Sequence, residues 1–301
     1  MFAQPSSRLH AVLLALFVTF LWATSWVLIK AGLHDIPALT FAGLRYVLAS
    51  LCLLPFALRS PANRAVLRAL PPRDYARIAM YGLVFVAITQ GAQFLGLQYL
   101  PAVTVSLLLN FTPVVVAFLG IAFLSERPTA RQWLGVGLYL AGILLYFYPV
   151  NVPSAQLLGI LVTLLGVLTN AISSIMGRSI NRQTHLSPLL VTVISMSVGS
   201  VALLTTGIIT QGIPPLSLAN WLTIGWLALV NTALAFPLWN HTLRTLSAVE
   251  SSIINSTMLV QIALLAYLFL GETLNTQDIA GMALVLLGTL IVQVRSAKRK
   301  T

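Results

Sequence analysis

Hydrophobic positions in this chain form long runs that are separated by short polar segments. The run from Leu100 to Glu126 is apolar for about 24 residues before its first charge, which is long enough to cross a ~30 Å hydrocarbon layer as one helix. Ten runs of this kind predict ten membrane-spanning helices. Their expected bounds are 11–29, 39–58, 76–97, 101–123, 130–148, 156–178, 188–209, 218–240, 248–270 and 277–294.

The run Leu100–Glu126 recurs 146 residues later as Leu246–Glu272, and at this offset about 16 of 51 aligned residues are identical. In both copies the glutamate is followed by the spacing E-x8-G-x6-G, with glycines at Gly135 and Gly142, and at Gly281 and Gly288. The chain is therefore predicted to be a duplicated membrane module, with one five-helix repeat at 1–150 and a second at 151–301. Glycines seven residues apart share a helix face, so we interpret them as positions of close helix packing.

Composition and charge narrow the class of protein. The chain is 58% hydrophobic and only 8% charged, whereas a soluble domain has about 25% charged residues. With the N-terminus placed inside, 15 of the 17 lysines and arginines fall in inner loops and tails, which predicts that both termini are cytoplasmic. Five helices separate equivalent positions, so the two repeats should be inverted relative to each other. The net charge of +11 is explained by membrane orientation and not by nucleic-acid binding.

Polar side chains inside the apolar runs are expected to avoid lipid, and to face other helices or a water-filled cavity. Pro113 would free a backbone carbonyl in the fourth run and is the candidate hinge. The alternative for these side chains is tight helix contact with hydrogen-bonded Ser and Asn, and Trp239 also suits an interfacial belt. The candidate cavity residues are Trp22, Thr24, Ser25, Arg45, Tyr81, Gln90, Gln93, Ser106, Asn110, Asn170, Ser174, Trp239, Ser252 and Ser256.

This inventory of aromatic rings, amides and cations suits a ligand with a flat apolar body and a carboxylate. Enzyme signatures are missing from the sequence, because the four histidines lie in tails or loops and no paired carboxylates occur inside the runs. The single cysteine, Cys52, allows no intrachain disulfide and no metal cluster. We therefore expect a protein that is not an enzyme and has no cofactor and no metal; intramembrane catalysis is the alternative class.

Arg45 is unusual because it lies about two turns inside the second run. A structural role would have it hold helix carbonyls or a partner such as Glu250, and a functional role would have it bind the carboxylate of a substrate. We favour the structural role, because a permanent cation in the site would slow release. Its counterpart in the second half, near Ser195 and Met196, is uncharged, so Arg45 cannot belong to a symmetric pair of sites.

Local patterns predict three smaller features. The segment 59–75, rich in Arg and Pro, is expected to form a surface helix on the headgroups. Thr129 with Gln132, and Asn275 with Asp278, have the spacing of an N-terminal capping box at the start of the fifth and tenth helices.

The duplicated unit, the two E-x8-G-x6-G hairpins and the P-x7-R-x3-A pattern at Pro37, Arg45 and Ala49 resemble the drug/metabolite transporter superfamily, in its ten-helix EamA-type exporter branch. The resemblance covers residues 11–293, and the chain looks most like the bacterial aromatic amino-acid exporters of that branch. It implies ten helices around a central cavity, alternating access and export across the inner membrane.

The resulting expectation is an all-α membrane protein of ten transmembrane helices, arranged as two inverted five-helix repeats around a central cavity. It would be a monomeric secondary transporter of the bacterial inner membrane, whose partners are a small-molecule substrate and the lipid bilayer, with no nucleic acid. Aromatic amino acids or similar amphipathic metabolites are the expected substrates. The alternative is an exporter of other small metabolites, such as aliphatic or sulfur amino acids or drugs.

Overall fold

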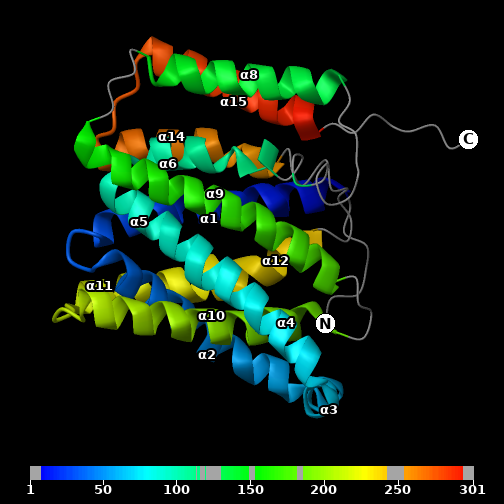
Figure 1. The fold of residues 1–301 in the computed structure, drawn as a ribbon. Helices are drawn as coiled ribbons and strands as arrows, with labels where there is room; N and C mark the ends of the chain where they lie inside the picture. The colour runs from blue at the N-terminus through cyan, green and yellow to red at the C-terminus, as the bar shows by residue number, and fades with distance from the viewer. Residues whose placement is uncertain are drawn as a thin grey trace, which may run out of the picture. The chain divides into compact units, whose positions relative to one another are not determined.

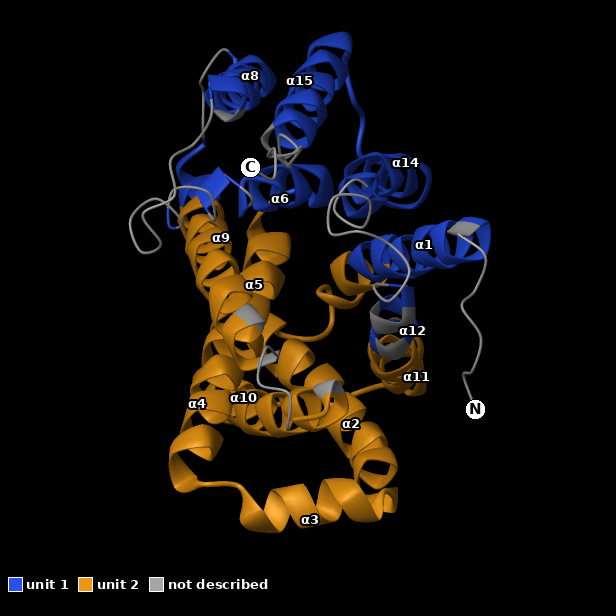
Figure 2. Ribbon diagram, turned by 90° about the vertical axis from the view of Figure 1, so that its right-hand side faces the viewer, with its two compact units in different colours: residues 1–27, 101–157, 235–301 blue, residues 28–100, 158–234 orange. Residues whose placement is uncertain are grey.

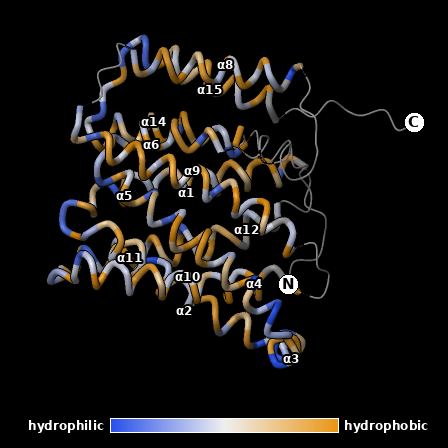
Figure 3. Tube along the Cα trace, viewed as in Figure 1, coloured by the Kyte–Doolittle hydropathy of each residue, from blue (hydrophilic) through white to orange (hydrophobic). Residues whose placement is uncertain are grey.

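The computed structural model describes residues 8–112, 114, 115, 119, 130–148, 153–181, 186–242 and 254–293, and the regular structure among them is entirely helical (Figure 1). Hydrophobic residues run along these helices (Figure 3). The elements are α1 (Arg8–Gly32), α2 (Ala38–Arg59), α3 (Pro61–Ala69), α4 (Pro72–Gly82), η1 (Leu83–Gln90), α5 (Gly91–Tyr99), α6 (Ala102–Leu109), α8 (Ala130–Tyr146), α9 (Ser154–Asn181), α10 (Pro188–Gln211), α11 (Leu218–Ala228), η2 (Leu229–Leu234), α12 (Ala235–Thr242), α14 (Met258–Leu270) and α15 (Thr276–Gln293).

Five stretches of helix are long and apolar enough to cross a membrane. They are Leu9–Gly32, Ala38–Arg59, Pro72–Tyr99, Ser154–Gly177 and Leu189–Gln211. Four shorter apolar stretches occupy most of four further predicted runs, namely Trp133–Tyr146, Leu218–Leu234, Ile254–Leu270 and Thr276–Ile291. The all-helical class is thus confirmed, and five of the ten expected spans have the length of a full crossing among the described residues.

The chain divides into two compact units, and each unit takes helices from both halves of the sequence (Figure 2). Unit 1 comprises residues 1–27, 101–157 and 235–301, and unit 2 comprises residues 28–100 and 158–234. The division into sequence repeats at residue 150 is a different partition, and it remains a prediction.

In unit 1, α8 packs against α15 through the glycines of the repeated motif. A Cβ added at Gly288 would lie 2.6 Å from the carbonyl oxygen of Gly135, and one added at Gly142 would lie 2.6 Å from that of Gly281. Since no side chain fits between these backbones, the interpretation of the glycines as positions of close packing is confirmed.

The glutamate of the second motif joins two hairpins of unit 1. The Glu272 carboxylate accepts hydrogen bonds from the backbone N–H groups of Ala102, at 2.6 Å, and Val103, at 3.2 Å. These N–H groups open α6 and have no partner within the helix, so a carboxylate stabilises them by hydrogen bonding and through the helix dipole. Nearby, Asn275 and Asp278 exchange side-chain to backbone hydrogen bonds of 2.9 and 2.8 Å, which confirms the second capping box. Glu126 and Thr129 lie outside the described residues.

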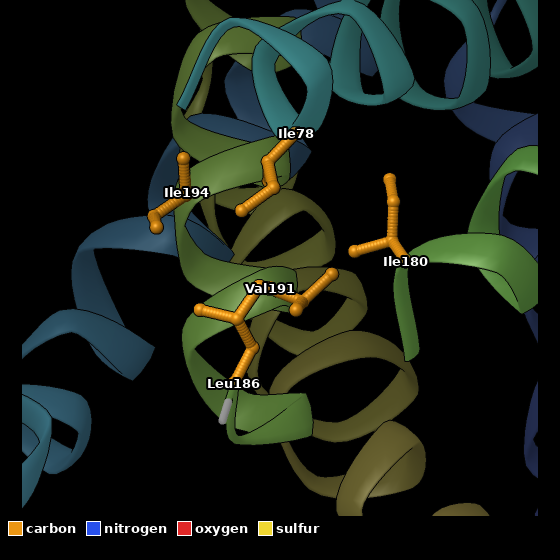
Figure 4. Close-up of a cluster of buried hydrophobic side chains, with 5 residues drawn as sticks. All are labelled: Ile78, Ile180, Leu186, Val191 and Ile194. Atoms are coloured by element: carbon orange, nitrogen blue, oxygen red, sulfur yellow. The ribbon is translucent and has the colours of Figure 1, made fainter. Parts of the chain in front are cut away.

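In unit 2, α10 packs on α2 and on α4. Glycine brings the backbones together at both crossings: a Cβ on Gly43 would lie 2.5 Å from the Cα atom of Leu204, and Cβ atoms on Gly82 and Gly199 would collide with the carbonyl oxygens of Ser195 and Gly82. Beside the second crossing, buried aliphatic side chains from α4, α9, α10 and the segment just before α10 point toward one another (Figure 4). They are Ile78, Ile180, Leu186, Val191 and Ile194.

The expected surface helix in the segment 59–75 is present as α3. It contains no buried residue, but Val66 and Leu67 pack on the aliphatic cluster of unit 2. The serine before it, Ser60, accepts a hydrogen bond from the backbone N–H of Asn63 and so caps the helix. Its position on lipid headgroups remains a prediction.

Two stretches of π-helix interrupt the long helices of unit 2, and their first residues, Leu83 in η1 and Leu229 in η2, are 146 residues apart. In each stretch a threonine hydroxyl lies 2.9 Å from the carbonyl oxygen five residues earlier, Thr89 with Val84 and Thr232 with Leu227. The wider turn of a π-helix exposes such carbonyls to a local side-chain partner, and π-helical turns are frequent at functional sites.

The fourth and ninth runs differ from the continuous helices predicted for them. α6 ends at Leu109 and is followed by a turn at Asn110 and Phe111, and a turn at Thr257 precedes α14. In the fourth run the break precedes Pro113, which can donate no backbone hydrogen bond and disfavours helix at the residue before it. In the ninth run, the Thr257 hydroxyl donates to the Ile254 carbonyl at 2.6 Å, a local bond that competes with the helical ladder.

Candidate substrate-binding residues

The structure assigns the candidate cavity residues to both units. Unit 1 holds Trp22, Thr24, Ser25, Ser106, Asn110, Trp239 and Ser256, and unit 2 holds Arg45, Tyr81, Gln90, Gln93, Asn170 and Ser174. Ser252 and the candidate hinge Pro113 lie outside the described residues. The approach of the whole set to one cavity therefore remains a prediction.

An aromatic cluster in unit 1 brings together two of the predicted residues. The Trp22 ring of α1 lies 5.2 Å from the ring of Trp239 and 5.6 Å from that of Phe236, both on α12, in tilted arrangements. Aromatic rings favour such offset geometry at this separation. Trp22 and Trp239 are both half-buried, so this cluster retains some accessible aromatic surface.

Several of the predicted hydroxyl and amide groups bond to their own helix. Thr24 and Ser25 donate to the carbonyls of Leu21 and Trp22, at 2.7 and 2.6 Å. The Asn110 side chain donates to the Ser106 carbonyl at 2.8 Å, and Ser174, which is exposed, donates to the Asn170 carbonyl at 2.8 Å. These contacts fit the alternative of structural polar groups within helices, because each satisfies the side chain without a ligand.

In unit 2, the Tyr81 ring stacks on Phe85, with ring centroids 5.6 Å apart, and packs against α9 at Gly177. Gln90 and Gln93 are half-buried and make no hydrogen bond with another described residue. An amide offers two donors and one acceptor. Both side chains therefore keep hydrogen-bonding capacity for a ligand or water.

Arg45 is 5% exposed, which makes it a buried cation in α2 of unit 2. Its Nε atom donates to the Thr232 hydroxyl of η2 at 3.1 Å, and that hydroxyl donates to the Leu227 carbonyl at 2.9 Å. The guanidinium carbon lies 5.2 Å from the Tyr46 ring centroid and 6.0 Å from that of Phe94. No carboxylate in the described part of the chain forms an ion pair with it.

Lys30, the basic residue that follows the first predicted run, has a different environment. Its ammonium group donates to the carbonyls of Leu97 and Leu100, at 2.6 and 2.8 Å, where α5 ends. These carbonyls have no helical partner, and a cation at the C-terminus of a helix is stabilised by the helix dipole. The role of Lys30 is therefore structural.

The sequence-based list omitted two polar contacts. Thr89 lies 2.9 Å from the Thr169 hydroxyl of α9 in unit 2, and Gln261 of α14 donates to Thr19 of α1 at 3.3 Å in unit 1. The signal for both was present, since each is a polar residue in an apolar run. The π-helices that position Thr89 and Thr232 have no comparable signal in the sequence.

Comparison with known proteins agrees with this architecture. The family model of the EamA-like transporter family matches the chain twice, at residues 9–148 and 157–294. A protein of Salmonella typhimurium named a probable amino-acid metabolite efflux pump is 26% identical over 290 residues, covering 92% of this chain and 93% of the relative. The uncharacterized transporter YvbV of Bacillus subtilis is 27% identical over 311 residues, covering 98% and 95%.

A solved crystal structure shares the fold, with a TM-score of 0.68 at 17% sequence identity, and the similarity covers 95% of this chain and 98% of that one. The two matches to the family model together take in nearly all of the helical residues. The chain thus belongs to the EamA-like transporter family and is a membrane transporter.

Proposed function

We propose that the protein is a secondary transporter of the bacterial inner membrane that exports aromatic amino acids or similar amphipathic metabolites. The observation that carries this proposal is full-length similarity to relatives named probable amino-acid metabolite efflux pumps, at 26% identity in both Salmonella typhimurium and Escherichia coli. The aromatic preference is supported by the cluster of Trp22, Phe236 and Trp239, whose rings offer apolar surface of the kind that a flat substrate needs.

Alternating access is the mechanism that we propose, with both termini cytoplasmic and two inverted repeats. Equivalent helices of the two sequence repeats pair within the units, α2 with α10 and α8 with α15. Pairs of this kind allow one repeat to rock against the other around a site at their interface. The candidate cavity residues are proposed to line that site, with the break before Pro113 as a hinge.

Counterflow in proteoliposomes tests this function. Vesicles containing purified protein would be loaded with unlabelled phenylalanine, and entry of labelled phenylalanine would be measured with and without a pH gradient. We expect saturable exchange that tryptophan and tyrosine compete for. Exchange of leucine or methionine but not of phenylalanine would replace the aromatic assignment with an exporter of aliphatic or sulfur amino acids. Non-saturable flux would contradict a carrier.

A further inference from the structure

We propose that Arg45 is a carboxylate-binding site, and that the substrates of this transporter are therefore amino acids or other organic acids and not the corresponding amines. The inference rests on the proposed function and names the substrate class within it. Its basis is a buried guanidinium whose contacts leave most of its hydrogen-bond donors available.

Most of the N–H donors of Arg45 have no acceptor among the described residues. A guanidinium has five N–H groups in a fixed plane, and Nε donates to Thr232 at 3.1 Å. Tyr46 and Phe94 contribute ring faces, which attract the charge but accept no conventional hydrogen bond. Among the described residues, nothing accepts from the Nη atoms. An unpaired buried charge is strongly unfavourable, and a carboxylate is its best complement because it takes two parallel N–H bonds.

Glu250 is not a suitable partner on the predicted topology. Arg45 lies about two turns from the extracytoplasmic end of the second span, whereas Glu250 is near the cytoplasmic end of the ninth. With a rise of ~1.5 Å per residue in a layer of ~30 Å, the two differ in depth by roughly 15 Å, which is beyond the reach of an ion pair. Two of the four described acids are engaged elsewhere, since Glu272 caps α6 and Asp278 caps α15. The other two, Asp35 and Asp74, form no ion pair with Arg45.

The bond to Thr232 adds orientation to charge. Thr232 accepts from Nε and donates to Leu227, so the edge of the guanidinium that carries Nε is fixed to η2. This leaves the Nη atoms as the free edge, in the planar geometry that a carboxylate needs. One edge of Arg45 thus holds the π-helix through the Thr232 hydroxyl, and not through the helix carbonyl that the sequence suggested, while the other edge binds the anion.

The test compares ligands with and without a carboxylate in direct binding and in counterflow. Dissociation constants for phenylalanine, phenylacetate and phenethylamine would be measured by calorimetry on the full chain in detergent, for the unmodified protein and for R45K, R45Q and E250Q. Arg59 is an exposed arginine on the same helix, so R59Q is the matched control. Unfolding temperatures would be recorded for every variant, and R45K keeps the charge if R45Q does not fold.

We expect phenylalanine and phenylacetate to bind and phenethylamine to bind about tenfold more weakly or worse. Losing a charge-assisted hydrogen bond costs about 1.5–3 kcal/mol, and each 1.4 kcal/mol is tenfold in the dissociation constant. R45Q should weaken the two carboxylates by a similar factor with little effect on phenethylamine, R45K should lie between, and E250Q and R59Q should match the unmodified protein.

Equal affinity for phenethylamine and phenylacetate, or unchanged carboxylate affinity in folded R45Q or R45K, would overturn the inference. So would tighter carboxylate binding in E250Q, because it would identify Glu250 as the resident counterion. If the unmodified protein binds carboxylates through Arg45 but shows no counterflow, the transport proposal fails and the anion site stands. If amines exchange at the same rate as acids, the transport proposal stands and the anion site fails.

Discussion

The two π-helical segments of unit 2 share a type of backbone conformation and differ in the groups that contact their threonines. η1 and η2 begin 146 residues apart, and each holds a threonine hydroxyl near the carbonyl five residues earlier. In η1 the threonine meets a neutral hydroxyl, Thr169. In η2 it meets the cation Arg45. The π-helical turn thus occurs at equivalent positions in the two halves, whereas the threonines do not, because at this offset Thr89 aligns with Ala235 and Thr232 with Val86.

The helix crossings beside the two π-segments differ in the residues at their closest approach. At the α4–α10 crossing, Gly82 and Gly199 bring the backbones into contact beside Ser195, which is near the expected counterpart of Arg45. The positions equivalent to these glycines on α11 and α2 are Ala228 and Ala49, both fully buried. At the glycine crossing there is no room for a side chain between the backbones, whereas each of these alanines carries a methyl group.

The two π-segments are expected to cross the bilayer in opposite directions, which gives the largest and an all-or-none effect. The basic residues of the predicted inner segments place helices three and eight in opposite directions. A reporter fused after Arg299 should behave as cytoplasmic, and one inserted at Gln211 as extracytoplasmic. The opposite pattern at both sites would contradict the inverted arrangement predicted for the two repeats.

Gly82→Ala should have the largest effect on stability. The added methyl would collide with the Ser195 carbonyl oxygen, and backbone has little freedom to move away. We expect a loss of about 3 kcal/mol in the free energy of unfolding, measured by thermal unfolding in detergent.

Gly225→Ala is the matched control for this change, because the new Cβ would meet nothing within 4 Å on α11 of the same unit. It should be neutral or stabilise by up to ~1 kcal/mol, since glycine disfavours helix. Equal changes in the free energy of unfolding for the two variants would mean that the close backbone contact at Gly82 does not determine stability.

Removing the threonine hydroxyls compares the two contacts directly. Thr232→Val should cost about 2–3 kcal/mol, because it leaves a buried charged donor without its acceptor. Thr89→Val should cost only about 1 kcal/mol, since Thr169 still donates to the Leu165 carbonyl at 2.9 Å. A larger loss for Thr89→Val would reverse the ranking of the two π-segments.

The smallest expected effect is the coupling free energy between Arg45 and Thr232, measured by replacing both residues. The Arg45→Met/Thr232→Val double variant removes both partners, so no polar group is left unsatisfied. Its loss in the free energy of unfolding should therefore be smaller, by about 1 kcal/mol or more, than the summed losses of the two single variants. The Thr89→Val/Thr169→Val pair is the neutral reference. Strict additivity at Arg45 and Thr232 would mean that their hydrogen bond contributes nothing to the fold.

The sequence predicted most helix positions because membrane spans need long apolar runs, and α2 (Ala38–Arg59) lies within one residue of the expected 39–58 at each end. It also predicted the glycine contacts, and the capping box at Asn275 and Asp278. In both cases the spacing alone carries the geometry.

Other features could not be predicted, because the hydropathy of a residue does not show whether its side chain faces lipid or a neighbouring helix. Leu97 is fully buried and Leu158 is 51% exposed, although both occupy apolar runs. The π-turns and the partner of Arg45 depend on which helices pack together. The pattern of hydrophobic positions does not predict those pairings. Among the candidate site residues, the ones whose hydroxyls bond to their own helix were indistinguishable from residues that keep free donors.

The glycine contacts between α8 and α15 have a symmetry of their own. Gly135 meets Gly288 and Gly142 meets Gly281, and exchanging every glycine for its equivalent in the other half returns the same two contacts. A surface that complements itself in this way is what a twofold homodimer requires. The contact between α8 and α15 therefore has the reciprocal geometry of a twofold interface, formed within one polypeptide.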